Sequence, residues 1–291
     1  MRIIRYQENA LFKLAALTDA EEIFPLEDPD FITLVQRAAL DGISVSEKVK
    51  RIIDSSQALN KEIHQLDLIV PLEAPEIWAA GVTYMRSKEA RNDEAASADG
   101  KGPTYYDKVY DADRPELFMK STAARTVGPG GEVCLRSDSS WQVPEPELGL
   151  VLDRNGNILG YTIGNDMSCR DIEGENPLYL PQAKIWRQSC SIGPAIRLAD
   201  TVEDPYDLQI SCRIYRGGQK VVDETANTGQ LKRRFEELVA YLAKDNILFD
   251  GTVLLTGTCI VPPGQFTLEL GDRIEIDITG IGTLTNIAVL A

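Results

Sequence analysis

The chain has 291 residues, of which 43% are hydrophobic, and a formal net charge of −15. This length and apolar content suffice for one large domain, or for a large and a small one, each with its own core. An acidic chain repels phosphate backbones, which disfavours nucleic-acid binding, although ordinary solubility explains the same charge. There is no run of about 18 apolar residues, so we expect no membrane-spanning helix. The N-terminus carries charge but no apolar segment, which is not typical of a secretory signal.

Five cysteines are scattered along the chain without a Cys-x-x-Cys pair. The odd number and the missing pairs predict neither a disulfide framework nor a zinc site, and they favour the reducing environment of the cytoplasm. The residues are Cys134, Cys169, Cys190, Cys212 and Cys259.

The chain is expected to divide into a small N-terminal α/β domain over 1–72 and a larger domain over 73–291. Residues 1–8 are predicted to form a strand, and 46–68 carry apolar residues at roughly helical spacing. The Leu-Ile-Val-Pro-Leu run at 68–72, followed by Pro75, predicts a strand end and a connector.

The larger region is predicted to be rich in short strands. Residues 77–82 are a candidate buried strand, and an amphipathic helix is expected over 231–242. Further strands, punctuated by Gly, Pro, Asn and Asp, are expected at 148–152, 158–163, 208–215, 253–258, 266–270, 273–278 and 283–289. The predicted fold class is therefore α+β, with most of its β-structure in the larger domain.

A long polar stretch over 86–113 interrupts this pattern, with Tyr105, Tyr106 and Tyr110 near its end. A loop of this length is usually either functional or disordered. The three aromatic side chains could dock against the domain, which favours a lid slightly over a disordered surface loop.

Glu145 and Glu147 are separated by a single residue. In an extended strand, residues i and i+2 point to the same face. Two neighbouring carboxylates on a half-buried face repel each other, so either a cation must neutralise them or one of them must hold a proton. The alternative is an acidic edge that faces solvent, because acidic pairs on strands are common.

The Asn-Gly pair at 155–156 predicts a hairpin with a two-residue type I′ turn. That register pairs Glu145 with Asp166 and Glu147 with Gly164. Three carboxylates then share one face, which makes a hard-oxygen site suited to Mg²⁺, Mn²⁺ or Ca²⁺ rather than to zinc. A bulge or a three-residue loop would shift the register by one residue and spoil the pairing.

Several segments, in order along residues 77–291, resemble the fumarylacetoacetate hydrolase superfamily. The most specific are Pro-Glu-Pro-Glu-Leu at 144–148 and Gly-Tyr-Thr-Ile-Gly-Asn-Asp-Met-Ser-Cys-Arg-Asp at 160–171. Further matches are Ala-Gly-Val-Thr-Tyr at 80–84, Leu-Phe-Met-Lys at 117–120, Ser-Ile-Gly-Pro at 191–194 and Leu-Thr-Gly-Thr at 255–258.

The resemblance implies a catalytic domain built on a rolled mixed β-sheet, usually in an oligomer, so that a homodimer or homotetramer is expected. It also implies a divalent metal, commonly Mg²⁺ with Mn²⁺ as the alternative, held by Glu145, Glu147 and Asp166. In this family the metal typically holds a 2-oxo-carboxylate or a similar pair of substrate oxygens. The hairpin argument reaches the same three residues independently.

Hydrolases of the family usually carry a histidine just after the tyrosine of the first motif, paired with a glutamate that helps it to activate water. In this chain Ser87 stands at that position. The single histidine, His64, lies in the leading region and is expected to be an ordinary surface residue. Without the histidine, water activation needs another base, which argues against hydrolysis of a carbon–carbon bond.

A narrower resemblance over 106–118 and 173–184 points to members of the family that remove water from 2-keto-3-deoxy sugar acids. It implies dehydration of a 2-keto-3-deoxy-pentonate to 2,5-dioxopentanoate, with Glu116 and Lys184 as catalytic residues. Metal chelation of the 2-oxo acid acidifies the C3 protons, so Lys184 is expected to take one while Glu116 helps to expel the C4 hydroxyl. The two roles are interchangeable at this stage, and the sequence does not fix the handedness at C4.

Further residues are assigned to substrate binding, and these are Tyr84, Lys120, Arg170, Gly257 and Thr258. The amides of the Thr-Gly-Thr segment are expected to cradle the substrate carboxylate, unless the segment is only a tight turn. Lys120 supplies positive charge for the anion or is simply an exposed strand lysine. Arg170 and Asp171 are expected to brace the segment that carries Asp166.

Two other functions compete with the dehydratase. One is a metal-dependent hydrolase or decarboxylase of an acylpyruvate-like 2-oxo acid, which the missing histidine opposes. The other is a non-enzymatic metal-binding protein that kept the fold, which is opposed by the retention of Glu116 and Lys184 beside the three carboxylates. The expected partner is a small-molecule 2-oxo acid, with no nucleic acid and no membrane.

Overall fold

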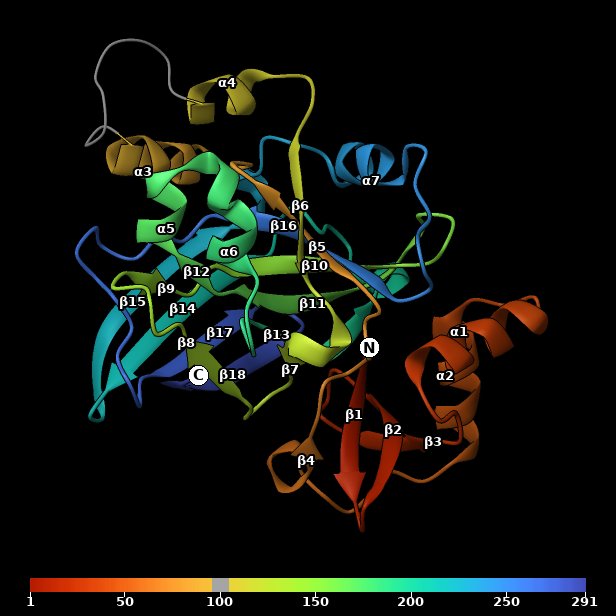
Figure 1. The fold of residues 1–291 in the computed structure, drawn as a ribbon. Coiled ribbons are helices and arrows are strands. Elements are labelled where there is room, and N and C mark those ends of the chain that lie inside the picture. The colour runs from red at the N-terminus through yellow and green to blue at the C-terminus, as the bar shows by residue number, and fades with distance from the viewer. Residues whose placement is uncertain (96–104) are drawn as a thin grey trace.

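Two β-sheets that pack face to face form the body of the protein (Figure 1). The structure is a computed structural model, and it describes residues 1–95 and 105–291. The larger sheet contains β1 (Arg2–Glu8), β2 (Leu11–Leu17), β3 (Ile23–Leu26), β4 (Asp67–Leu68), β5 (Ile77–Gly81), β6 (Glu116–Ser121), β7 (Thr126–Val127), β10 (Pro146–Leu152), β11 (Ile158–Asp166), β13 (Cys190–Leu198) and β16 (Thr252–Thr258). The smaller sheet contains β8 (Glu132–Leu135), β14 (Gln209–Arg216), β15 (Gln219–Asn227), β17 (Arg273–Ile278) and β18 (Gly282–Leu290).

Seven α-helices and a two-stranded ribbon accompany the two sheets among the described residues. The ribbon pairs β9 (Gln142–Val143) with β12 (Ser168–Cys169). The helices are α1 (Phe31–Leu40), α2 (Val45–Ser55), α3 (Met85–Ala95), α4 (Tyr105–Asp111), α5 (Arg170–Glu175), α6 (Leu180–Lys184) and α7 (Phe235–Ala243). Figure 1 shows α3, α5 and α6 stacked together, and they contact β6, β9 and β12. Within the described residues, no helix has the length and apolar character needed to cross a membrane.

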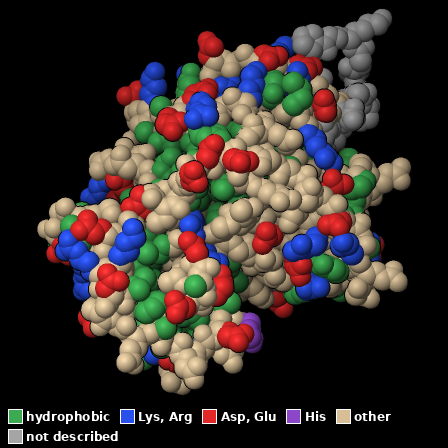
Figure 2. All heavy atoms as spheres, turned by 180° about the vertical axis from the view of Figure 1, so that it is seen from behind, with side chains coloured by type: hydrophobic (Ala, Val, Ile, Leu, Met, Phe, Trp, Pro, Cys, Tyr) green, Lys and Arg blue, Asp and Glu red, His purple; other side chains and the backbone are tan. Residues whose placement is uncertain are grey.

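The core lies between the two sheets. Every residue of β10 is buried, because this strand is central in the larger sheet and covered on both faces. In contrast, β14 and β17 alternate buried and more exposed residues, as expected for strands with one face towards the core and one towards solvent. On the face shown in Figure 2, acidic and basic side chains are interspersed, and no large basic patch gathers there.

The leading region is joined to the rest of the protein by strand pairing. The predicted first strand is confirmed as β1, and Ile3 of β1 pairs with Ile196 of β13. The helix predicted over 46–68 was right only as far as Ser55, where α2 ends. The Ser55 hydroxyl donates to the carbonyls of Arg51 and Ile52, and Ser56 is extended, so the chain leaves the helix at these polar residues. Strands β2 and β3 and helix α1 were not predicted.

Most predicted strands of the larger region are confirmed, and three other predictions for this region need correction. Residues 266–270 form no strand, although the Leu268 amide donates to the Gln142 carbonyl. The stretch 86–113 was expected to be one long loop, but its two ends form most of α3 and all of α4. The part of the expected lid over 96–104 lies outside the described residues. The predicted helix over 231–242 begins later, at Phe235.

The hairpin between β10 and β11 has the predicted register at its far end but a different turn. The amide of Asp153 donates to the carbonyl of Asn157, so the loop has three residues, and Gly156 alone among them has a positive φ, of 82°. This is the arrangement of a type I turn followed by a left-handed glycine. Next along the ladder, Leu152 pairs with Ile158 but Val151 with Gly160, so a bulge inserts one extra residue. The two shifts cancel, and Glu147 pairs with Gly164 as predicted.

The turn geometry makes a prediction about Gly156. Replacing it with alanine places a Cβ at a φ of 82° and at 3.1 Å from Cγ1 of Val239. We expect Gly156→Ala to lower the free energy of unfolding by about 1 kcal/mol or more in urea denaturation. The matched control is Gly174→Ala, because Gly174 lies in helix α5 with open space around its Cβ, and this change should leave stability equal or higher. Equal losses in both variants would contradict the assigned turn.

Candidate active site and metal centre

Three carboxylates meet at the end of the β10–β11 hairpin. Glu145, Glu147 and Asp166 each offer an oxygen within 4.8 Å of the others. All three side chains are buried, between 0% and 3% exposed. Glu145 directly precedes β10, and its carbonyl accepts the amide of Asp166 at 3.0 Å. The hairpin therefore brings together the three residues that the register predicted.

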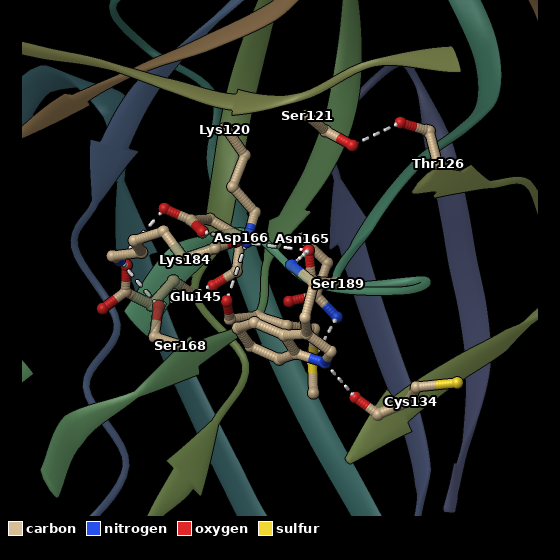
Figure 3. Close-up of polar contacts among 12 residues, drawn as sticks. Lys120, Ser121, Thr126, Cys134, Glu145, Asn165, Asp166, Ser168, Lys184 and Ser189 are labelled. Atoms are coloured by element: carbon tan, nitrogen blue, oxygen red, sulfur yellow. Dashed lines mark hydrogen bonds and ion pairs between the residues drawn. The ribbon is translucent and has the colours of Figure 1, made fainter. Parts of the chain in front are cut away.

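Three basic side chains are buried against these carboxylates, and Figure 3 shows two of them, Lys120 and Lys184, beside Glu145 and Asp166. The Lys120 ammonium lies 2.7 Å from Oδ1 of Asp166, and Nη2 of Arg170 lies 2.7 Å from Oε1 of Glu145. Lys184 donates to Oε2 of Glu145 at 2.6 Å and to Oδ2 of Asp166 at 3.0 Å. A buried charge is tolerated only when it is paired, so these contacts explain how three lysine and arginine side chains fit in the interior.

Lys184 uses all of its donors in this arrangement. Its third hydrogen bond goes to Oγ of Ser168 at 2.6 Å, and the ammonium group lies 5.4 Å from the ring centre of Phe118. Short helix α6 ends at Lys184, and its backbone carbonyl accepts hydrogen bonds from Lys120 and Ser189. The side chain is thus fixed in position with its charge directed at the carboxylates.

Glu147 is the carboxylate that contacts no basic side chain among the contacts of the described residues. Burial, followed by the charges of Asp166 and Glu145, raises the pKa of Glu147 well above its ordinary value. Its Oε2 accepts the backbone amide of Gly257 at 2.6 Å. Gly257 has a φ of 99°, and a Cβ there would lie 1.9 Å from Oγ1 of Thr83, so only glycine fits this position.

A small cleft opens onto the carboxylates. Glu116 lies on its wall at the start of β6, packed so closely on Gly81 that a Cβ there would meet Oε2 of Glu116 at 2.0 Å. Ser87, which stands where hydrolases of the family carry histidine, is 5% exposed and also lines the cleft. His64 is remote from this cleft, with an exposed side chain beside Glu62.

The contacts correct several of the roles predicted for substrate binding. Lys120 is fully buried beside Asp166 and is not among the residues that line the cleft, so the alternative of an exposed strand lysine is wrong. The amide of Gly257 is occupied by Glu147 rather than directed at a substrate carboxylate. Arg170 is held by Glu145, in line with its predicted bracing role.

Tyr84 and Thr258, which were also predicted to bind substrate, differ in their position relative to the cleft. Tyr84 is 1% exposed and stands behind the cleft, where burial, followed by the nearby Cys259 and Glu147, raises the pKa of its phenol well above its usual value. Thr258 lines the cleft, and its hydroxyl donates to the carbonyl of Ile260 at 2.9 Å. Thr258 is therefore part of the cleft wall, whereas Tyr84 is buried and is not among the lining residues.

Sequence reasoning missed two polar residues of this site. Ser168 accepts from Lys184, and Glu173 lines the cleft from helix α5 while only 5% exposed. Both lie inside the segments that carry the family resemblance. Their residue types and spacing did not distinguish them, because neither strand β12, which carries Ser168, nor helix α5, which carries Glu173, was predicted.

The donor set fits a hard divalent cation. Three buried carboxylate oxygens within 4.8 Å of one another match the oxygen ligands that Mg²⁺ and Mn²⁺ prefer, and no thiol or imidazole joins them among the described residues. The raised pKa of Glu147 also indicates a site with negative charge still to be balanced.

Comparison with known proteins places this site in a family. Residues 76–289 match the family described as Fumarylacetoacetate (FAA) hydrolase C-terminal. The chain is 46% identical over 256 residues to a probable 2-keto-3-deoxyxylonate dehydratase of Haloferax volcanii, covering 88% of this chain and 86% of that protein. It is 41% identical over 284 residues to the 2-dehydro-3-deoxy-D-arabinonate dehydratase of Saccharolobus solfataricus, covering 98% and 95%.

Solved structures give the same result. A 2-keto-3-deoxy-D-arabinonate dehydratase complexed with magnesium and 2,5-dioxopentanoate superimposes with a TM-score of 0.84 at 38% identity, covering 100% of this chain and 99% of that one. The β-rich architecture with its mixed sheets agrees with this likeness. The chain therefore belongs to the fumarylacetoacetate hydrolase family.

Proposed function

We propose that this protein is a Mg²⁺-dependent dehydratase that converts a 2-keto-3-deoxy-pentonate into 2,5-dioxopentanoate, with Mn²⁺ as the alternative metal. The observation that carries the proposal is the joint lining of one cleft by Glu116, Lys184 and the three carboxylates. The names of the relatives support the same reaction and metal. Ser87 in place of histidine distinguishes the site from that of a water-activating hydrolase.

The two relatives are named after different sugars, but the 2-keto-3-deoxy acids of these sugars have the same structure when both sugars belong to the D series. In both 2-keto-3-deoxy acids C2 carries a carbonyl and C3 carries no hydroxyl, so C4 is the single stereocentre left. Arabinose and xylose of the D series share the same handedness at C4. Their acids are then one compound, and we propose the D form as the substrate.

Lys184 is proposed as the base that removes a proton from C3. A divalent metal on Glu145, Glu147 and Asp166 would chelate the 2-oxo-carboxylate, acidify the C3 protons and stabilise the enolate. Lys184 lies beside two of these carboxylates, so it is positioned next to the metal-binding end of a substrate, where C3 must lie. Lys184 acts as a base only after its ammonium group has released one proton. A bound divalent metal would favour this release, because it adds positive charge beside the ammonium group.

Glu116 is proposed as the acid that gives a proton to the departing C4 hydroxyl. It comes from β6 rather than from the hairpin, and it shares the cleft with Lys184 without contributing to the carboxylate triad. Loss of the C3 proton and of the C4 hydroxyl together removes one water. The chain is further proposed to work in the cytoplasm as a homodimer or homotetramer, and light scattering after size exclusion measures that state.

The assigned roles predict different defects in two variants. Lys184→Met should lower kcat by about a thousandfold, because a positioned base contributes about 10²–10⁴. It should also abolish exchange of the C3 protons with D₂O. Glu116→Gln should lower turnover similarly but keep C3 exchange, because it leaves the base intact. Turnover is read through 2,5-dioxopentanoate with a coupled dehydrogenase, and C3 exchange by NMR.

Controls separate this reaction from its rivals. Lys220→Met, on the outer strand β15, should behave as the wild type. EDTA should abolish turnover, and an acylpyruvate should not be cleaved. Full turnover by Lys184→Met would remove its assigned role, and acylpyruvate cleavage would favour the hydrolase instead.

Glu147 predicts how pH and Mg²⁺ together affect stability. Its pKa is raised in the folded protein, so between the ordinary glutamate pKa and the raised value the folded state keeps a proton that the unfolded chain has released. The stability of the metal-free protein should therefore fall as pH rises through this range. Mg²⁺ needs the ionised carboxylate, so its stabilising effect should grow over the same range.

Melting temperatures measured with EDTA and with Mg²⁺ from about pH 5 to about pH 8 test this dependence. Glu147→Gln should flatten the EDTA curve and weaken the response to Mg²⁺. Parallel wild-type curves with and without Mg²⁺ would contradict the assignment of Glu147 as a metal ligand.

A further inference from the structure

The proposed product requires more than the loss of water. Removing the C3 proton and the C4 hydroxyl gives a 2-oxo acid with a C3=C4 double bond and a hydroxymethyl group at C5. The product 2,5-dioxopentanoate has the same composition but an aldehyde at C5. One C5 proton must therefore leave, and carbon-bound protons must be regained at C3 and C4. This isomerisation needs a base near C5, and its assignment here rests on the proposed function.

The cleft offers a second carboxylate for this step. If the 2-oxo-carboxylate of the substrate is bound at the triad and Lys184, as the proposed function requires, C4 and C5 extend toward the rest of the cleft wall. Glu116 and Glu173 line that remaining part, from β6 and α5 respectively. Glu173 is 5% exposed, in a helix whose Glu175 faces solvent. The carboxylate side chain of Glu173 is therefore part of the cleft wall, whereas that of Glu175 is not.

Glu116 is less suited to remove the C5 proton. It delivers a proton to the C4 hydroxyl, and the water formed lies between its carboxylate and the substrate. Glu173 belongs to a different element and takes no part in the first elimination. In this scheme Glu173 acts as the base of the second step, while Glu116 contacts the water formed in the first.

We propose that Glu173 is a further catalytic residue, the base that removes a proton from C5 of the unsaturated 2-oxo acid. The electrons of the C5–H bond form a C4=C5 double bond, those of C3=C4 move to C2=C3, and the C2 carbonyl takes the negative charge. The enolate then re-forms its carbonyl and takes a proton at C3 from Lys184, which holds the proton removed earlier. The remaining C5 enol loses its O–H proton to solvent and takes a proton at C4 from Glu173, which completes the aldehyde.

The test compares Glu173→Gln with Glu175→Gln, the same change on the solvent side of the same helix. With Mg²⁺ and the 2-keto-3-deoxy-pentonate, Glu173→Gln should form aldehyde about a hundredfold more slowly than the wild type. The conjugated intermediate should accumulate and be seen by its ultraviolet absorbance and by NMR. Exchange of the C3 protons should continue, and Glu175→Gln should match the wild type. A substrate with deuterium at C5 should slow aldehyde formation in the wild type.

Each outcome decides a separate point. No aldehyde from the wild type would overturn the proposed function, and the role of Glu173 with it. Aldehyde from Glu173→Gln at the wild-type rate, with no intermediate, would assign both steps to Glu116 or to solvent and overturn this inference alone. If Glu173→Gln does not fold, Glu173→Ala serves as the second uncharged variant. Failure of both to fold would assign Glu173 to stability and likewise overturn the inference.

Discussion

The burial of three carboxylates beside one another is the constraint on which the rest of the site depends. Two like charges about 4 Å apart repel by about 4 kcal/mol at an effective dielectric constant of about 20, so three of them cannot remain ionised without nearby positive charge. The protein supplies three buried basic groups, Lys120, Arg170 and Lys184. Each basic group would itself be unstable in the interior without the carboxylates. Charge balance therefore explains why strands β6 and β11 and helices α5 and α6 must meet at this point.

The parts of the site that could be predicted from the sequence are those set by local patterns. The carboxylate triad follows from alternation along a strand and from one Asn-Gly pair, because both are local patterns. The predicted pairing of β10 with β11 was correct at Glu147, but the predicted turn was not. The loop closed by Asp153 and Asn157 has one residue more than expected, and the bulge between Val151 and Leu152 compensates for it. Nothing in residue type signals that bulge, since it depends on how the strand packs against its neighbours.

The partners of the triad could not be found by local patterns. Lys120 was predicted either to supply charge for the substrate or to be an exposed strand lysine, and it becomes a buried contact of Asp166 because β6 and β11 meet in the folded protein. The pairing of β1 with β13 joins segments almost two hundred residues apart, so the continuity of the larger sheet was equally hidden. The short helices α5 and α6 have too few residues for an apolar period to appear. What fails from sequence is therefore mainly long-range contact and the exact type of a turn, while strand alternation and the position of the hairpin turn are predicted correctly.

In the proposed function, substrate binding and the departure of the hydroxyl belong to different parts of the cleft. At the triad end, Glu147 is held by the Gly257 amide and Glu145 by Arg170, so the geometry for binding two adjacent substrate oxygens is fixed by the backbone and by buried charge. Members of one family can share this end while acting on different bonds. Elsewhere on the cleft wall lie Ser87, at the position where hydrolases of the family carry histidine, and Glu116, to which the proposed function assigns the departure of the hydroxyl. The identity of the reaction is thus set by residues that bind no metal, and small changes on that wall are sufficient to redirect a common enolate chemistry.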